Sequence, residues 1–372
     1  MNHPLAGGVH PGTMNRRQFL AATTLTAAGA AAGLCAPEVP APRELPEPTA
    51  ARLPRWRGFN FLEMFNADYH HPFQETDFVW MAEWGFNFTR LPMSYKCWAD
   101  PQDWRKLKED ELKRVDEAVA FGRKHGVHTC LNLHRAPGYC VNPPAEPLSL
   151  WKDEAALDAC AFHWGHLARR CQGVPNRHVS FDLLNEPANV SEADYARVVR
   201  RLVAAIRAED SQRFVIADGL QWGTKPVPSL ADLGIAQSTR GYVPMPISHY
   251  KASWVGGGKW SEPTWPLQPG TPEEWNRERL RRENIVPWQA LEKQGVGVHV
   301  GEWGCYQYTP HPVALAWMKD NLELWRDAGW GWALWNFRGS FGILDSQRTD
   351  VTYEDFRGHK LDRKMLALLQ AH

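Results

Sequence analysis

Two glutamates of this chain each end a short apolar run, and they lie far apart in the sequence. Glu186 stands in Asn185-Glu186-Pro187 after two leucines, and Glu302 stands in Gly301-Glu302-Trp303-Gly304 after Val300. Hydrolysis of a glycosidic bond needs two carboxyl groups, because one protonates the departing oxygen while the other attacks or stabilises the anomeric carbon. A pair of acids that ends two strands therefore indicates glycoside chemistry.

The elements that must position these acids alternate along the chain. From residue 55 onward, apolar runs of strand length alternate with segments of helical period, which is the pattern of repeated βα units around a parallel sheet. We therefore predict an α/β fold, a single (β/α)8 TIM barrel. An eight-stranded barrel typically needs about 250 residues plus loop insertions, which fits the roughly 320 residues that follow the N-terminal region. The predicted strands are Gly58–Met64, Phe86–Leu91, His128–His134, Val179–Asn185, Phe214–Ala217, Met245–His249, Val298–Glu302 and Gly331–Asn336.

The helices expected between these strands end at recurrent glycines. Gly85, Gly126, Gly173, Gly295 and Gly329 each precede a strand, as expected where a left-handed residue turns the chain back. The crossover from residue 221 to residue 242 is the one irregular unit. An open doubly wound sheet is the alternative fold, but no glycine-rich phosphate turn follows the first strand. The predicted helices are Asp77–Trp84, Asp110–His125, Glu154–Cys171, Ala193–Ala208, Thr271–Gln294, Val313–Ala328 and Lys360–Leu369.

The N-terminal region is predicted to be an export signal and a linker. Arg16 and Arg17 precede an apolar, small-residue run, which is typical of a twin-arginine signal, and this run is too short to span a bilayer comfortably. We expect a signal peptide over residues 1–36, a proline-rich linker over 37–50 and the catalytic domain over 51–372. The protein would then be periplasmic or extracellular. A lipid anchor at Cys35 stays open, because Leu34 before it suits such a site poorly.

Composition limits the classes of partner. The 42 basic and 42 acidic side chains give a net charge of zero, so neither nucleic acid nor an anionic membrane surface is an expected partner. A neutral oligo- or polysaccharide fits better, and the 19 tryptophans would suit stacking on flat sugar faces. No cysteine or histidine cluster has the spacing of a zinc site, so we expect no metal and no cofactor. We also expect a monomer.

An exported protein permits disulfides, and six cysteines remain after Cys35. Cys97 and Cys140 fall in loops that should emerge on the same face of the barrel, which makes them the best candidate pair. Cys130 lies within a predicted strand and is expected to be a buried thiol.

Further polar or aromatic residues end the predicted strands. All strands of a parallel barrel point their C-terminal ends at one mouth, so these side chains should converge whatever their separation in sequence. Arg90 would hold a carboxylate ionised, unless it forms an ion pair at the barrel rim. His134 has a buried core histidine as its alternative, and Trp335 an ordinary packing residue. The candidates beside the two glutamates are Arg90, His134, Asn185, His249, Tyr250 and Trp335.

The ordered set of these motifs resembles glycoside hydrolase family 5, the cellulase-like retaining (β/α)8 enzymes, over essentially the whole chain after the linker. The matching segments are Phe88-Thr89-Arg90-Leu91-Pro92, Leu131-Asn132-Leu133-His134, Asn185-Glu186-Pro187, Ser248-His249-Tyr250, Gly301-Glu302-Trp303-Gly304 and the strand of Trp335. The resemblance implies Glu186 as general acid/base and Glu302 as nucleophile. It also implies that Asn185 contacts the sugar 2-hydroxyl, that Arg90 and His134 support the carboxylates, that His249 lines the subsite and that Trp335 stacks on the sugar.

One position departs from the family pattern. The family usually has a tyrosine two residues beyond the histidine of the sixth strand, to hydrogen-bond the nucleophile, whereas here that position is Lys251 and Tyr250 follows His249 directly. A shift of one residue in an ideal strand turns a side chain to the opposite face. Tyr250 would then reach Glu302 only if the strand has already ended or bulged there.

The substrate and the stereochemistry stay open at this point. A β-linked glucan is the first expectation, with mannan or another β-glycan next, and long loops would make the enzyme exo-acting if they closed one end of the cleft. A carboxyl separation of about 5–5.5 Å would favour retention, which is the expected outcome. A non-catalytic carbohydrate-binding barrel is the alternative from another class. Candidate sugar-stacking or loop-packing residues are Trp98, Trp104, Trp151, Trp254, Trp260 and Trp265.

Overall fold

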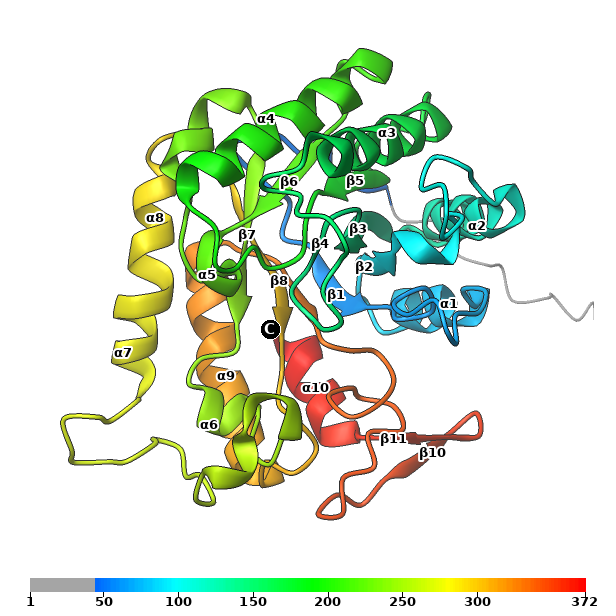
Figure 1. Cartoon of the computed structure of the whole chain (residues 1–372). Coiled ribbons are helices and arrows are strands. Elements are labelled where there is room, and N and C mark those ends of the chain that lie inside the picture. The colour runs from blue at the N-terminus through cyan, green and yellow to red at the C-terminus, as the bar shows by residue number, and fades with distance from the viewer. Residues whose placement is uncertain (1–43) are drawn as a thin grey trace, which may run out of the picture. The chain divides into compact units, whose positions relative to one another are not determined.

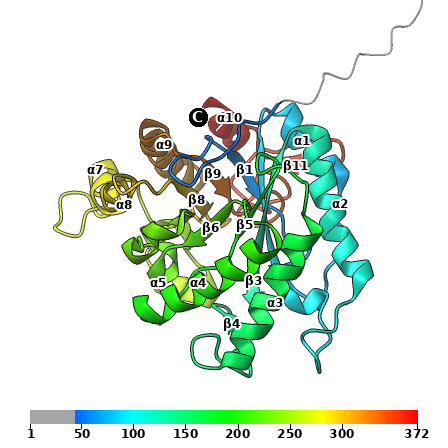
Figure 2. The same ribbon diagram turned by 90° about the horizontal axis from the view of Figure 1, so that it is seen from above.

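The structure is a computed structural model that describes residues 44–372, and the predicted signal peptide and the first part of the predicted linker lie outside the described residues. Eight parallel strands form a closed ring, because β2 pairs with β3 as well as with β1. Helices surround this ring (Figures 1 and 2). The predicted (β/α)8 barrel is confirmed. Its strands are β1 (Arg57–Asn60), β2 (Phe88–Ser94), β3 (His128–Ala136), β5 (Val179–Asp182), β6 (Val215–Asp218), β7 (Ala236–Gly241), β8 (Val298–Trp303) and β9 (Trp332–Leu334).

The long helices agree with the sequence to within a few residues. Gly126 and Gly329 end α2 and α9 in the left-handed conformation, as predicted for glycine stop signals. The helix expected over Thr271–Gln294 is shorter and is interrupted by a π-helical turn at Arg281–Ile285. The long helices and the two pieces beside this turn are α1 (Glu75–Glu83), α2 (Glu109–His125), α3 (Glu154–Arg170), α4 (Glu192–Glu209), α7 (Arg277–Leu280), α8 (Val286–Glu292), α9 (His311–Ala328) and α10 (Arg363–Ala371).

Shorter elements lie in the segments that follow three of the barrel strands. β4 (Tyr139–Cys140) pairs antiparallel with the end of β3, and β10 (Glu354–Phe356) forms a hairpin with β11 (His359–Leu361). α5 (Leu220–Gly223) follows β6. In residues 44–372, no helix is both long enough and apolar enough to cross a membrane.

The predicted sixth strand is wrong. Met245–Ser248 forms the short helix α6, and the strand is β7, which lies inside the segment that the sequence marked as an irregular crossover. Pro246 lies in the first turn of α6, a position that proline favours. β7 has no apolar pattern, because its polar side chains can be buried where they have hydrogen-bond partners. Gln237, for example, exchanges hydrogen bonds with the backbone of Val227 at 2.8 and 2.9 Å.

The predicted disulfide is also wrong. All six cysteines of residues 44–372 are free. Cys97 is buried, and its thiol lies 3.3 Å from the carbonyl oxygen of Met64, whereas Cys140 belongs to the β4 hairpin. Burial raises the pKa of Cys97 to about 12, so its thiol is protonated and unreactive at neutral pH. Cys130 is buried, as expected.

The tryptophans serve mainly to pack the two layers of the barrel. Trp164, Trp288, Trp303 and Trp317 fill the space between the strands and the helices and are fully buried. A second, smaller apolar cluster plugs the barrel interior, where the ring of Trp56 stacks on that of His128 at a centroid distance of 3.9 Å. Tryptophan abundance therefore reflects core packing more than sugar binding.

Replacement of Trp56 by alanine should destabilise the protein by about 3–5 kcal/mol, because the ring is fully buried and its removal leaves a cavity beneath the site. Urea unfolding followed by circular dichroism measures this change. Tyr69→Ala is the matched control, since Tyr69 is 69% exposed and its loss should change the free energy of unfolding by less than about 0.5 kcal/mol. Equal effects of the two substitutions would contradict the packing role of Trp56.

Candidate active site

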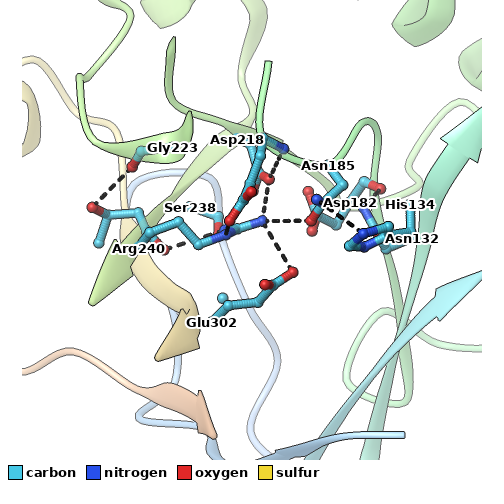
Figure 3. Close-up of polar contacts among 12 residues, drawn as sticks. Asn132, His134, Asp182, Asn185, Asp218, Gly223, Ser238, Arg240 and Glu302 are labelled. Atoms are coloured by element: carbon cyan, nitrogen blue, oxygen red, sulfur yellow. Dashed lines mark hydrogen bonds and ion pairs between the residues drawn. The ribbon is translucent and has the colours of Figure 1, made fainter. Parts of the chain in front are cut away.

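A cluster of buried charged residues lies on five barrel strands. Four members lie at or next to the C-terminal ends of their strands, namely Asp182 on β5, Asp218 on β6, Arg240 on β7 and Glu302 on β8, and the fifth is Arg90 in the first half of β2. All five side chains are at most 4% exposed. Figure 3 shows most of the cluster, with Arg240 between Asp218, Asn185 and Glu302. The barrel therefore brings distant parts of the sequence to one place, as predicted.

Three side chains contact the carboxylate of Glu302. Arg90 Nη1 donates to its Oε1 at 2.5 Å, and Arg240 Nη2 lies 3.5 Å from the same oxygen. The hydroxyl of Tyr242 donates to the other oxygen, Oε2, at 3.3 Å. Two guanidinium groups and a phenol thus fix the orientation of this carboxylate.

Glu186 lies in the loop directly after β5 and has a strained backbone. Its φ of 50° is in the left-handed region, which residues other than glycine seldom adopt. The surroundings hold it there: its peptide N–H donates to Asp218 Oδ2 at 2.8 Å, and the Tyr139 hydroxyl donates to its carbonyl oxygen at 2.7 Å. The side chain points back into the cluster, where Arg240 Nε donates to Oε1 at 3.1 Å.

The two glutamates differ in their surroundings. Burial, and secondly the negative charge of Glu302, raise the pKa of Glu186 to about 8, although Arg240 opposes the shift. Glu186 therefore holds a proton at neutral pH. Glu302 lies beside both Arg90 and Arg240.

Arg90 is a buried member of the cluster and not an ion pair at the rim. Its guanidinium donates to Asp182 at 2.7 Å, to Asn185 Oδ1 at 2.9 Å and to Asn60 Oδ1 at 3.2 Å, besides Glu302. Burial acts to lower the pKa of Arg90, but the carboxylates of Asp182 and Glu302 outweigh it and raise the pKa above its ordinary value. Arg90 is thus a permanent cation.

Asn185 and His134 lie beside the two arginines. Asn185 Oδ1 accepts a hydrogen bond from Arg90 and another from Arg240, each at 2.9 Å, and its Nδ2 faces His134 Nε2 at 3.4 Å. Burial and then the charge of Arg90 lower the pKa of His134 well below its usual range, so the imidazole is neutral. The ring of Trp335 lies nearly parallel to that of His134, at a centroid distance of 5.8 Å.

His249 and Tyr250 come from the end of α6 and not from a strand. The ring of His249 lies 5.0 Å from that of Tyr242, so His249 adjoins the site through this tyrosine. Tyr250 is buried, and no hydrogen bond in residues 44–372 joins it to Glu302. The phenol at Glu302 belongs to Tyr242, which directly follows β7. The apparent shift of the family's tyrosine arose from the wrong position of the sixth strand.

The sequence analysis did not predict four residues of this site: Asp182, Asp218, Arg240 and Tyr242. The signal for the first two was present, since each ends a strand, but the predicted strands ended at other residues. The signal for Arg240 and Tyr242 was the sequence Thr239-Arg240-Gly241-Tyr242, which has an unusual arginine beside a glycine and a tyrosine. A strand prediction that relied on apolar residues could not find it.

The candidate tryptophans divide by their exposure. Trp98 is buried, and its indole N–H donates to His163. Trp265 hydrogen-bonds Asp320 on α9 at 2.8 Å, so it packs the loop. Trp254 is 58% exposed, and its ring lies 6.0 Å from that of His249. Among these three, Trp254 alone offers an open ring near the site.

The part of the chain that the structure describes contains no set of side chains suited to bind a metal ion. No group of three or more histidine, cysteine, aspartate or glutamate side chains there could hold a metal ion. The acidic residues of the cluster are instead compensated by Arg90 and Arg240.

Comparison with known proteins gives a consistent picture. The family model of cellulases (glycosyl hydrolase family 5) matches residues 52–340. Endoglucanase C of Acetivibrio thermocellus is 25% identical over 78% of this chain and 92% of its own length. A solved structure described as a glycoside hydrolase is 38% identical, covers 85% of this chain and 99% of its own, and superposes with a TM-score of 0.81.

More distant structures share the fold. The structure of Thermotoga maritima Cel5A in complex with cellobiose is 21% identical, covers 85% of this chain and 97% of its own, and has a TM-score of 0.68. The family match spans most of the catalytic domain, and the buried acids lie at the barrel mouth. This chain belongs to the cellulase family, glycosyl hydrolase family 5.

Proposed function

We propose that the protein is a retaining β-glycoside hydrolase that cleaves β-linked glucans through Glu186 and Glu302. The observation that carries the proposal is that both carboxyl groups contact one guanidinium, with Arg240 3.1 Å from Glu186 and 3.5 Å from Glu302. Two acids held by one side chain face the same small volume, which a single glycosidic bond can occupy. The raised pKa of Glu186 suits an acid, and the two arginines beside Glu302 suit a nucleophile.

The reaction would proceed by double displacement. Glu302 attacks the anomeric carbon and forms a glycosyl ester, while Glu186 gives its proton to the departing oxygen. In the second half, Glu186 removes a proton from water, whose oxygen attacks the same carbon, and the ester bond to Glu302 breaks. Arg90 and Tyr242 stabilise the carboxylate of Glu302 before the attack and after its release.

The neighbouring residues suit the recognition of a sugar in this position. Asn185 Oδ1 is occupied by Arg90 and Arg240, and its Nδ2 faces His134, so the second N–H of the amide is left to donate to a sugar hydroxyl such as the 2-hydroxyl. Trp335 would supply the apolar face for the reacting ring, with His134 beside it. His249 adjoins this position through Tyr242, whereas Tyr250 is left out of the proposed binding set because the hydroxyl that reaches Glu302 belongs to Tyr242.

A β-glucan is the preferred substrate class because three curated relatives that each match 78% of this chain are endoglucanases. Mannan stays a second candidate, since Thermotoga maritima Cel5A, which shares the fold, has also been crystallised with mannotriose. A non-catalytic sugar-binding barrel is disfavoured because both acids are present and both contact Arg240. The twin arginines of the N-terminal region support export of the enzyme.

Glu302→Ala should abolish turnover of a soluble β-1,4-glucan, because no other group can form the glycosyl ester, and binding of cello-oligosaccharides should persist. Reducing-sugar release and isothermal titration calorimetry measure the two properties. Wild-type protein assayed with and without a chelator, on β-glucans and mannans, defines the substrate. Undiminished turnover by Glu302→Ala would contradict the proposed role.

The pH dependence should show an alkaline limit near pH 8. Glu186 must be protonated to donate, and its pKa is raised to about 8, so kcat/KM should be maintained below this pH and fall as pH rises through it. Initial rates between pH 5 and pH 10 test this. Glu186→Gln should lose activity on glucan but still form the glycosyl-enzyme from an activated aryl glycoside, whose leaving group needs no proton. A fall of both activities together would contradict an acid role.

Tyr242→Phe should lower kcat about 10–100-fold, because Glu302 loses the hydrogen bond that orients it, while folding is retained. Tyr250→Phe is the matched control and should leave kcat close to that of the wild type. Steady-state kinetics on the same glucan compares the two. An unchanged kcat in Tyr242→Phe would contradict a catalytic role for this hydrogen bond.

A further inference from the structure

The arginine of β7 occupies a position where the family pattern leads one to expect histidine. The family usually has its tyrosine two residues beyond a histidine, and the tyrosine at the nucleophile is here Tyr242. The residue two positions earlier is Arg240. This chain therefore carries a permanent cation, with several donors, where a titratable ring would be expected.

Arg240 contacts both acids of the pair through different nitrogen atoms. Its Nε donates to Glu186 Oε1 at 3.1 Å, and its Nη2 lies 3.5 Å from Glu302 Oε1 (Figure 3 shows the second contact). Arg90 contacts Glu302, whereas the arginine that donates to Glu186 within residues 44–372 is Arg240. The planar guanidinium of Arg240 thus fixes the two carboxyl groups relative to each other.

The surrounding structure is built to hold this guanidinium. Asp218 is fully buried and accepts from Nη1 and Nη2 of Arg240, and Ser238 Oγ accepts from Nη1 at 3.0 Å. Two glycines leave the necessary space. A Cβ at Gly301 would lie 2.8 Å from Nη1, and a Cβ at Gly223 would lie 2.7 Å from Cγ of Arg240.

We propose that Arg240 is a positioning residue that couples Glu186 to Glu302 and sets the pH at which Glu186 loses its proton. The inference rests on the proposed function, because it concerns the same two acids. During formation of the glycosyl ester, negative charge leaves Glu302 and the departing proton leaves charge on Glu186. A cation that contacts both groups stays beside the charge at either stage, so little reorganisation is needed.

The effect of Arg240 on Glu186 must be separated from that of its other neighbours. Burial, Glu302 and Asp218 raise the pKa of Glu186, whereas Arg240 and, more weakly, Arg90 lower it. Removal of the charge at position 240 should therefore raise this pKa further. The titratable and charged groups that face Glu186 or Arg240 are Arg90 on β2, His134 on β3, Tyr139 on β4, Asp182 on β5, Asp218 on β6, Tyr242 after β7 and Glu302 on β8.

The test compares wild-type protein with Arg240→Met and Arg240→Lys in two measurements. The first is the pKa of the Glu186 carboxyl from ¹³C NMR of protein with labelled glutamate, with the resonance assigned by its absence in Glu186→Gln. The second is the pH profile of kcat/KM on a β-1,4-glucan. Arg240→Met should raise the pKa and the alkaline limit of the profile by about 1–3 units and lower kcat about 100-fold.

Arg240→Lys should keep the alkaline limit near that of the wild type, because the positive charge remains. It should lower kcat, because one ammonium group cannot contact both acids as the planar guanidinium does. Arg213→Lys is the control for loss of a buried guanidinium. Arg213 is 3% exposed and contacts Asp210 and the carbonyl oxygen of Cys171, away from the two glutamates. Arg213→Lys should change the free energy of unfolding without changing the pKa of Glu186.

An unchanged pKa of Glu186 in Arg240→Met would overturn the proposal, as would a loss of activity that is equal at every pH. If Arg240→Met does not fold, Arg240→His studied above pH 7.5 supplies the uncharged side chain, and the same two outcomes apply. Wild-type protein that cleaves no β-glycan would instead contradict the proposed function. The NMR titration would still decide whether Arg240 controls the proton of Glu186.

Discussion

The site depends on the balance between two buried guanidinium groups and four carboxyl groups. Arg90 and Arg240 contact Asp182, Asp218, Glu186 and Glu302 in a region where an unpaired charge would be very costly. The balance is incomplete, and burial raises the pKa of Glu186 to about 8 and that of Asp182 to about 7. Burial, together with the excess of carboxyl groups over arginines, is thus the physical reason that Glu186 holds a proton.

The rest of the barrel surrounds this cluster with closely packed side chains. The tryptophan-rich layer between strands and helices and the plug around Trp56 close the space beneath the site. Asn60 at the end of β1 accepts from Arg90 and donates to the carbonyl oxygen of Gly301, which ties the first strand to the strand of Glu302. Side chains that are fixed in this way need little rearrangement when charge moves during a reaction.

Much of the site could be predicted because strand ends in a parallel barrel share one mouth. Arg90, His134, Asn185, Glu186, Glu302 and Trp335 were found in this way, each at or near the end of a predicted strand. Arg240 and Tyr242 were missed because β7 has the sequence Ala-Gln-Ser-Thr-Arg-Gly, in which no apolar run marks a strand. The polar side chains of β7 are satisfied only by partners on other strands, and a sequence pattern does not contain those partners.

The sequence alone determined the barrel, its family and the two acids, since the alternation of apolar runs and glycine-ended helices is local information. The tertiary structure decided which tyrosine reaches Glu302, that the cysteines stay unpaired and that one guanidinium contacts both acids. These features depend on the distance between atoms of different strands. The register of parallel strands and the burial of charge set that distance, and both arise only when the chain closes into a ring.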